Sequence, residues 1–369
     1  MEQFLLVKMK SADPYERGIQ YGEQAAELIA RGIEGYRRHF RKSMAKSWEE
    51  ITEKSALYLP LLERDFPQEL AEARGIAAGS GRTLEEILAL NCRYEILKLK
   101  KKLPQPSECT TGAILSQAAA GDRVYMVQNW DYRPWVKDHS VVISIDDCQG
   151  TRILGLAEAG QLVRNGLNNH GVGVCANNLT STYDTGEVGA PVTFIRRRAL
   201  AQRSFEAARQ VIEGTRVGVS CNYLVASAED LAADLEVTPG RVYCLSPEEG
   251  IVTHANHMVA GAEVCTNKGR KFRDGVLRRL LEERRGKLDV PALMECLKNH
   301  ETYPGAPDRY PEADSIEAVC THLPLGEFDQ DRVWQTIASA IYDLKGGCAY
   351  ICKGTPCTGE YVRYDLSRP

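Results

Sequence analysis

The chain has 369 residues, of which 43% are hydrophobic and 26% charged, so it can bury a substantial core as one large or two ordinary domains. Its net charge of -4 argues against nucleic acid as the main partner. No apolar run approaches the ~20 residues of a membrane span. The apolar run over residues 4–7 is too short for a secretory signal and has no small-residue cleavage site after it. We therefore expect a cytoplasmic protein, in which the 12 cysteines are reduced.

The first third of the chain is predicted to be helical. Asp13 followed by Pro14 marks a helix start, and the helical pattern runs to about Phe40. Further helices are expected over residues 47–63, 66–78 and 83–97, the last opening with a capping box. Residues 98–106 carry charges and two prolines without a helical period, which predicts an exposed linker.

The remainder is predicted to consist of strands with a few helices. Strands over residues 111–116 and 123–131 are expected around a turn at residues 120–122. Amphipathic helices are predicted over residues 191–212 and 269–285, and a long surface loop over residues 299–314. Further short strands are predicted over residues 141–145, 153–157, 223–226, 242–245, 338–342, 348–352 and 361–364.

Cys109 lies where the helical segment ends and the strands begin. If the Glu108–Cys109 bond were cut, the thiol would belong to a new first residue whose own amine is the nearest base. A free α-amino group has a pKa of roughly 7.7–8.0, so its neutral form accepts a thiol proton near physiological pH. The same sulfur can release that amine by attacking the preceding carbonyl, with the Thr111 hydroxyl assisting.

Two further residues suit this chemistry. Asp131 ends the second predicted strand, where the hairpin returns near Cys109 and a carboxylate can bind the new ammonium group. Asn256 follows a short apolar strand start at residues 251–252. A side-chain amide suits an oxyanion hole because it donates a hydrogen bond without a charge that would perturb the thiolate.

Four sequence blocks carry a family resemblance through their order and spacing: residues 109–111, 129–131, 168–173 and 254–257. Together they resemble the autoproteolytic cysteine N-terminal-nucleophile hydrolases of the acyl-CoA:6-aminopenicillanate acyltransferase type, a peptidase C45-like family. The resemblance implies an α+β fold. This fold is a four-layer αββα sandwich of two stacked antiparallel sheets between helical layers, with a helical N-terminal prosegment.

The resemblance also implies a role for each site residue. Cys109 would be the nucleophile and the cleavage point, Thr111 a cleavage helper, Asp131 the partner of the amine and Asn256 the oxyanion donor. Residues 1–108 would remain as a small subunit, and residues 109–369 would form the catalytic large subunit. The expected substrates are a small-molecule acyl donor, an amide or a thioester, and an amine or water as acceptor. No cofactor is expected, although a coenzyme A thioester would fit as a co-substrate.

Two alternatives stay open. The penicillin enzyme has glycine before its cysteine, whereas this chain has Glu108, so one alternative is an uncleaved relative that binds an acylated small molecule without turnover. The other is a conjugated-bile-acid or penicillin V amidase, although those enzymes begin at the nucleophile after removal of methionine. The motifs do not distinguish transfer to an amine from hydrolysis.

No metal site is predicted. His254 and His257 lie three residues apart, and no third ligand follows at zinc spacing. Cys348, Cys352 and Cys357 fit neither the Cys-x-x-Cys nor the zinc-finger pattern.

Overall fold

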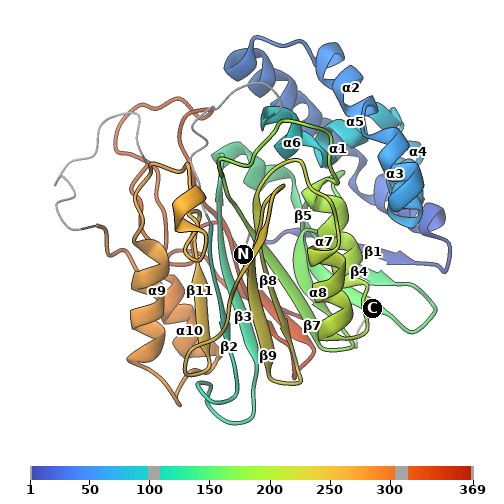
Figure 1. The fold of residues 1–369 in the computed structure, drawn as a ribbon. Coiled ribbons are helices and arrows are strands. Elements are labelled where there is room, and N and C mark those ends of the chain that lie inside the picture. The colour runs from blue at the N-terminus through green and yellow to red at the C-terminus, as the bar shows by residue number, and fades with distance from the viewer. Residues whose placement is uncertain (1, 99–108, 304–314, 367–369) are drawn as a thin grey trace.

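Two β-sheets stack face to face in the centre of the molecule, and helices cover both outer faces (Figure 1). The computed structural model describes residues 2–98, 109–303 and 315–366. Helices α1–α8 pack with one sheet, and α9 and α10 pack with the other. A third apolar layer lies between the sheets. The predicted four-layer αββα sandwich is therefore confirmed.

The larger sheet has eight strands in the order β1-β4-β5-β6-β7-β8-β9-β10. Its first pair, β1 with β4, is parallel, and the other pairs are antiparallel. The strands are β1 (Leu5–Lys10), β4 (Ser140–Asp146), β5 (Arg152–Glu158), β6 (Asn165–Asn168), β7 (Val172–Asn178), β8 (Cys221–Ser227), β9 (Leu231–Val237) and β10 (Val242–Leu245).

The smaller sheet has six antiparallel strands in the order β11-β2-β3-β12-β13-β14. The strands are β11 (Ile251–His254), β2 (Cys109–Ile114), β3 (Tyr125–Tyr132), β12 (Gln335–Asp343), β13 (Cys348–Lys353) and β14 (Tyr361–Asp365). Since side chains alternate along a strand, Cys109 and Ala113 face the layer between the sheets, whereas Ile114 faces α9 and α10.

The helices fall into three groups along the chain. An N-terminal group precedes β2, a pair covers the larger sheet, and a last pair covers the smaller sheet (Figure 1). The bounds are α1 (Pro14–Met44), α2 (Trp48–Ala56), α3 (Leu59–Asp65), α4 (Pro67–Ser80), α5 (Leu84–Asn91), α6 (Arg93–Lys98), α7 (Val192–Leu200), α8 (Phe205–Glu213), α9 (Arg273–Glu282) and α10 (Val290–Leu297). Two 3₁₀ segments are η1 (Pro134–His139) and η2 (Ala262–Val264).

The N-terminal segment is built into the rest of the fold. Strand β1 adds a parallel edge to the larger sheet by pairing with β4. The Tyr21 hydroxyl donates to the carbonyl oxygen of Gln161 at 3.0 Å. The buried Glu72 carboxylate accepts two hydrogen bonds from Arg197 on α7. Residues on both sides of Cys109 therefore share one core.

Glycines let α1 and α4 approach each other closely. A Cβ atom added to Gly75 would overlap the Tyr15 carbonyl oxygen, and one added to Gly18 would overlap the Glu72 carbonyl oxygen. Any larger residue at these positions would force the two helices apart. This contact positions the N-terminal helices over the larger sheet.

Most predicted elements are present, with shifted ends. The Asp13 side chain caps α1 by accepting from the backbone of Tyr15, and Thr83 and Glu86 form the predicted capping box. Three segments predicted as single helices each form two helices in the structure. Residues 47–63 divide into α2 and α3, where Pro60 opens a new helix because it lacks an N–H group. Residues 83–97 divide at Cys92, and residues 191–212 divide before Ser204, which caps α8.

Other elements escaped prediction. Strands β1, β6 and β9 and helix α10 have sequence patterns that are too short or too mixed to stand out. Most of the predicted linker (residues 99–106) and most of the predicted loop (residues 304–314) lie outside the described residues.

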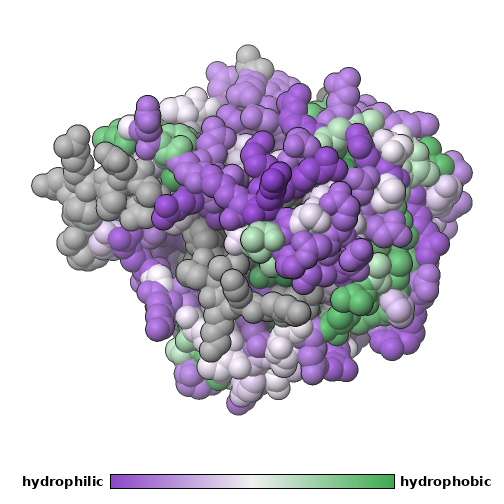
Figure 2. All heavy atoms as spheres, turned by 90° about the horizontal axis from the view of Figure 1, so that it is seen from above, coloured by the Kyte–Doolittle hydropathy of each residue, from purple (hydrophilic) through white to green (hydrophobic). Residues whose placement is uncertain are grey.

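Hydrophilic residues occupy most of the face seen from above, and hydrophobic residues form smaller groups among them (Figure 2). Among the described residues, no helix combines the length and the apolar character that crossing a membrane requires.

Candidate active site

Cys109 is the first residue of β2 and is held between two neighbouring strands. On one side it lies opposite Trp130 of β3. On the other side, its backbone N–H donates to Asn256 Oδ1 at 2.7 Å, just beyond the end of β11. The residue is only 6% exposed. The structure therefore brings together Cys109 and Asn256, as the predicted site requires.

Three contacts fix the orientation of the Asn256 amide. Its Oδ1 accepts from Cys109 and also from Arg273 Nη2 at 3.0 Å. Its Nδ2 donates to the carbonyl oxygen of Asn178, at the end of β7, at 3.1 Å. Because Oδ1 faces two donors and Nδ2 faces an acceptor, the opposite amide orientation would break this network. Nδ2 carries a second hydrogen, the group that an oxyanion would use.

Asp131 lies one residue beyond the partner of Cys109 on β3, as the predicted hairpin requires. Its carboxylate is 1% exposed and accepts from Arg273 Nη1 at 2.8 Å, Thr336 Oγ1 at 2.6 Å and Thr321 Oγ1 at 3.2 Å. Burial raises the pKa of Asp131 to about 7, although Arg273 and both hydroxyls favour the charged form. Among the described hydrogen bonds, the Cys109 nitrogen donates to Asn256 rather than to this carboxylate.

The Cys109 thiol is held in its neutral form in the continuous chain. Burial, together with the Asp131 carboxylate, raises its pKa to about 12. Arg164, the Asp131 backbone and Arg273 act in the opposite direction. At neutral pH the sulfur therefore needs a nearby base before it can act as a nucleophile.

Thr111 lies two residues along β2, on the same face as Cys109. Its hydroxyl accepts from Asn177 Nδ2 at 2.8 Å and donates to the His254 carbonyl oxygen at 3.4 Å. The structure thus places Thr111 within the site, and its role in cleavage stays a prediction. Glu108, the other side of the predicted cleavage point, lies outside the described residues.

Arg273 joins Asp131 and Asn256 but was not predicted from the sequence. It opens α9, inside a segment expected only to be an amphipathic helix. One weak signal was available, because a cation in the first turn of a helix opposes the helix dipole. Such a residue needs a compensating partner, and here Asp131 provides one.

An ion pair supports the loop that carries Asn256. His254 Nε2 lies 3.0 Å from Glu236 Oε1, and both side chains are fully buried. The other Glu236 oxygen accepts from the backbone of Gly261 at 2.8 Å. The neighbouring Asp234 and Glu236 carboxylates outweigh burial and raise the pKa of His254 to about 9. His254 therefore helps to hold the loop that carries Asn256.

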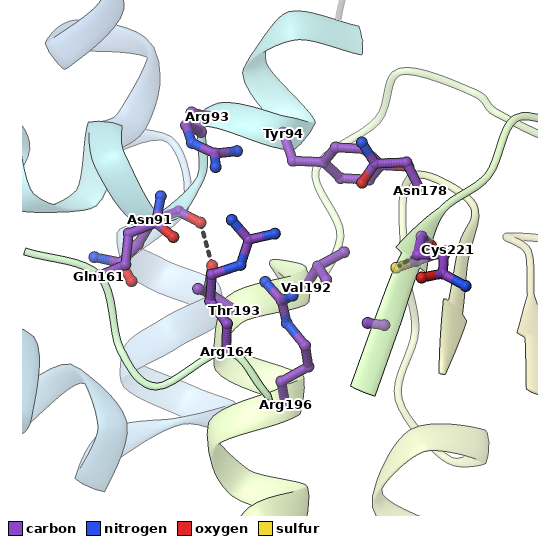
Figure 3. Close-up of a pocket in the computed structure, with 12 residues that line it drawn as sticks. Asn91, Arg93, Tyr94, Gln161, Arg164, Asn178, Val192, Thr193, Arg196 and Cys221 are labelled. Carbon is purple, nitrogen blue, oxygen red and sulfur yellow. Dashed lines mark hydrogen bonds between the residues drawn. The ribbon is translucent and has the colours of Figure 1, made fainter. Parts of the chain in front are cut away.

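A small pocket lies next to this site, between α6, α7 and the ends of β7 and β8. Asn177 and Asn178 line it, and they contact Thr111 and Asn256 respectively. Three arginine side chains also line it, and their guanidinium groups converge in its centre: Arg93, Arg164 and Arg196 (Figure 3).

The three arginines differ in their partners. Arg93 and Arg164 both pair with the buried Glu158 carboxylate. Arg196 is 5% exposed, and no carboxylate among the described residues forms an ion pair with it. Burial, together with Arg164, lowers its pKa to about 10. A buried cation without a counter-charge is costly, so an anionic ligand group would stabilise it.

Comparison with known proteins shows a similarity to one family. Residues 118–287 match the model of the acyl-coenzyme A:6-aminopenicillanic acid acyltransferase family. The match begins after Cys109 and includes Asp131, Asn256 and Arg273. The chain is also 26% identical, over 247 residues, to the 40 kDa form of that acyltransferase from Emericella nidulans, covering 66% of this chain and 67% of the relative.

Two solved structures are also similar. A variant of conjugated bile acid hydrolase from Clostridium perfringens aligns with a TM-score of 0.47 and 13% identity, covering 70% of this chain and 93% of that one. A Caenorhabditis elegans orthologue of N-acylethanolamine-hydrolyzing acid amidase aligns with a TM-score of 0.44 and 15% identity, covering 64% and 93%.

Proposed function

Because this chain is similar to the acyl-coenzyme A:6-aminopenicillanic acid acyltransferase family, we propose that it is an enzyme that transfers or hydrolyses an acyl group, with Cys109 as its nucleophile. The observation that carries this proposal is the 2.7 Å hydrogen bond from the Cys109 nitrogen to Asn256 Oδ1. It fixes the nitrogen that chain cleavage would convert into an α-amine, directly beside the sulfur.

The first step is self-processing of a precursor. The sulfur attacks the carbonyl carbon of Glu108, the C–N bond breaks, and the thiol proton ends on the released amine. Water then hydrolyses the thioester, which leaves a carboxylate on Glu108 and restores the thiol. The contacts of β1 and α1–α6 with the rest of the fold would hold residues 1–108 as a small subunit after cleavage.

Cleavage supplies the base that the site needs. In the continuous chain the Cys109 nitrogen belongs to an amide and cannot accept a proton. After cleavage it becomes an amine with a pKa of roughly 7.7–8.0, close to the pH at which the enzyme would work. It can then accept the thiol proton, and the resulting ammonium beside the sulfur favours the thiolate.

The transfer reaction uses the same groups. The thiolate attacks the carbonyl carbon of an amide or thioester, and the second N–H of Asn256 Nδ2 donates to the developing oxyanion. The leaving amine or thiol takes its proton from the Cys109 ammonium, which leaves an acyl group on the sulfur. An amine or water then attacks this acyl-cysteine, and the choice between them separates an acyltransferase from an amidohydrolase.

The pocket lined by Arg93, Arg164 and Arg196 suggests the kind of substrate. Asn178 forms part of the pocket wall and accepts a hydrogen bond from Asn256, so a ligand in the pocket would lie beside the proposed oxyanion site. Arg196 would bind a carboxylate or phosphate on the acyl donor or acceptor. A coenzyme A thioester meets this requirement, as does an amino-acid conjugate.

Denaturing intact-mass analysis tests processing directly. Wild-type protein should give two fragments that meet between Glu108 and Cys109, and Cys109→Ala should give one full-length species. Cys175→Ala, which changes another buried thiol in the layer between the sheets, should be processed normally. Incubation with acyl-thioesters and N-acyl amines should then add one acyl mass to the fragment that begins at Cys109. A single full-length wild-type species that forms no adduct would contradict the proposal and favour an uncleaved binding protein.

A further inference from the structure

Two cysteines and two histidines from three separate segments converge on the outer side of the smaller sheet. His300 follows α10, Cys320 and His322 precede β12, and Cys357 lies between β13 and β14. One ligand atom from each residue lies within 4.8 Å of the others. We propose that these four side chains bind a structural zinc ion, independently of the activity of Cys109.

Four of the six distances between ligand atoms are close to those of a tetrahedral site. Zinc–sulfur bonds of about 2.3 Å and zinc–nitrogen bonds of about 2.0–2.1 Å give edges of about 3.8 Å between two sulfurs, about 3.6 Å between sulfur and nitrogen and about 3.4 Å between two nitrogens. The two sulfurs lie 3.8 Å apart, and each lies 3.4 Å from His322 Nε2. The two histidine Nε2 atoms lie 3.0 Å apart. These four distances are therefore close to the edges of a zinc centre, and all four ligand atoms lie within 4.8 Å of one another.

Ordinary hydrogen bonding does not account for this convergence. His322 Nε2 faces Cys320 Sγ, Cys357 Sγ and His300 Nε2 at once. A neutral imidazole nitrogen carries at most one proton and cannot satisfy three such neighbours. A cation at the centre would accept an electron pair from all four atoms. Two thiolates and two neutral imidazoles form a standard zinc set, and binding would release the two thiol protons to solvent.

The site is closed, which points to a structural role. Four protein ligands complete a tetrahedral shell, whereas catalytic zinc keeps one position for water or substrate. Thr321 lies between two of the ligands, and its hydroxyl donates to Asp131 Oδ2 at 3.2 Å. The ion would therefore stabilise the segment at residues 315–322 that supports the Asp131 carboxylate.

Metal analysis of the full-length protein provides the first test. We expect about one zinc ion per chain by mass spectrometry, and Co²⁺ added to metal-free, reduced protein should give the absorption bands of a tetrahedral thiolate complex. Mutation of a residue that only hydrogen-bonds to a metal ligand typically lowers metal affinity by about 10–100-fold. Cys320→Ser and Cys357→Ser change the ligands themselves, so they should weaken zinc binding by at least that factor. Cys352→Ala, a neighbouring thiol outside the cluster, should bind the metal normally.

The wild-type protein alone can overturn the proposal, so the test does not depend on the variants folding. Absence of both bound zinc and the cobalt bands would do so, as would a Cys320–Cys357 disulfide in protein kept under reducing conditions. Hydrogen exchange gives an independent readout: removal of the metal should speed exchange over residues 315–322 but not over β8. Equal exchange in both states would refute the stabilising role. None of these measurements depends on acyl transfer.

Discussion

The side-chain oxygen of Asn256 accepts a hydrogen bond from the backbone nitrogen of Cys109, a residue 147 positions earlier in the chain. The same oxygen accepts from Arg273, which in turn pairs with Asp131. One buried network thus connects the proposed nucleophile and its backbone nitrogen with the Asp131 carboxylate. The predictions below test this network and the fold that holds it.

Asn256→Ala removes both the acceptor of the Cys109 nitrogen and the proposed oxyanion donor. Loss of one oxyanion donor typically costs about 10²–10³-fold in rate, so processing should slow by at least that factor. The measurement is the cleaved fraction against time after synthesis. Asn169→Ala, in an exposed turn of the larger sheet, is the matched control. Processing of Asn256→Ala at the wild-type rate would remove Asn256 from the mechanism.

Asp131→Asn removes the charge that balances buried Arg273. Breaking a buried ion pair typically costs about 3–5 kcal/mol in the free energy of unfolding, measured by denaturant titration. The double variant Asp131→Leu with Arg273→Met should be less destabilised than the two single variants added together. Glu283→Gln, which breaks an exposed pair with Arg279, should cost less than about 1 kcal/mol. A similarly small cost at Asp131 would show that its pair with Arg273 is unimportant for stability.

His254 should make stability depend on pH. The neighbouring carboxylates raise its pKa to about 9 in the folded protein, above the unfolded value of 6.5. The resulting stabilisation is fully present below pH 6.5 and is lost as the pH rises through 9. At about 1.4 kcal/mol for each pKa unit, the loss is about 3–4 kcal/mol.

The comparison of wild type with His254→Gln isolates this contribution. The difference in the free energy of unfolding between the two proteins should shrink as the pH rises from 6.5 to 9. His170→Gln, in a half-buried surface turn, should follow the wild-type curve. A constant difference between wild type and His254→Gln would mean that His254 is neutral in the folded protein.

Gly75→Ala tests the contact between α1 and α4. The added methyl group would overlap the Tyr15 carbonyl oxygen, and we expect a cost of about 1–3 kcal/mol or more in stability. Gly275→Ala in α9 is the matched control, because no atom lies within 4 Å of the added Cβ. Alanine there should stabilise the protein by about 0.5–1 kcal/mol. Thermal unfolding should show a lower melting temperature for Gly75→Ala and a higher one for Gly275→Ala. If both variants were more stable than wild type, α1 and α4 would not be in tight contact.

Arg196→Met tests recognition of an anion in the pocket. For acyl donors or acceptors with a carboxylate or phosphate, KM should rise by about tenfold or more, since a charged hydrogen bond contributes about 1.5–3 kcal/mol. For uncharged analogues KM should stay nearly constant. Arg203→Met, on the surface beside the Gln149 carbonyl, is the control. An equal change for charged and uncharged substrates would indicate that Arg196 only supports the pocket wall.

The sequence alone determined the local relationships of the site. The antiparallel pairing of β2 with β3, two strands adjacent in the chain, places Asp131 next to the partner of Cys109. The helix caps at Asp13 and Thr83 followed from their own neighbours in the chain. Two of the divisions in the long predicted helices also have local causes, namely Pro60 at the start of α3 and the Ser204 cap of α8.

Only the tertiary structure decided which distant groups meet. Periodicity reports the face of an element on which a side chain lies, but it does not report what packs against that face. The packing of β11 and α9 against β2 brings Asn256 and Arg273 to Cys109. The pocket around Arg196 and the cluster around His322 likewise join segments that share no motif in sequence. Their chemistry arises from the stacking of two sheets, which no single segment encodes.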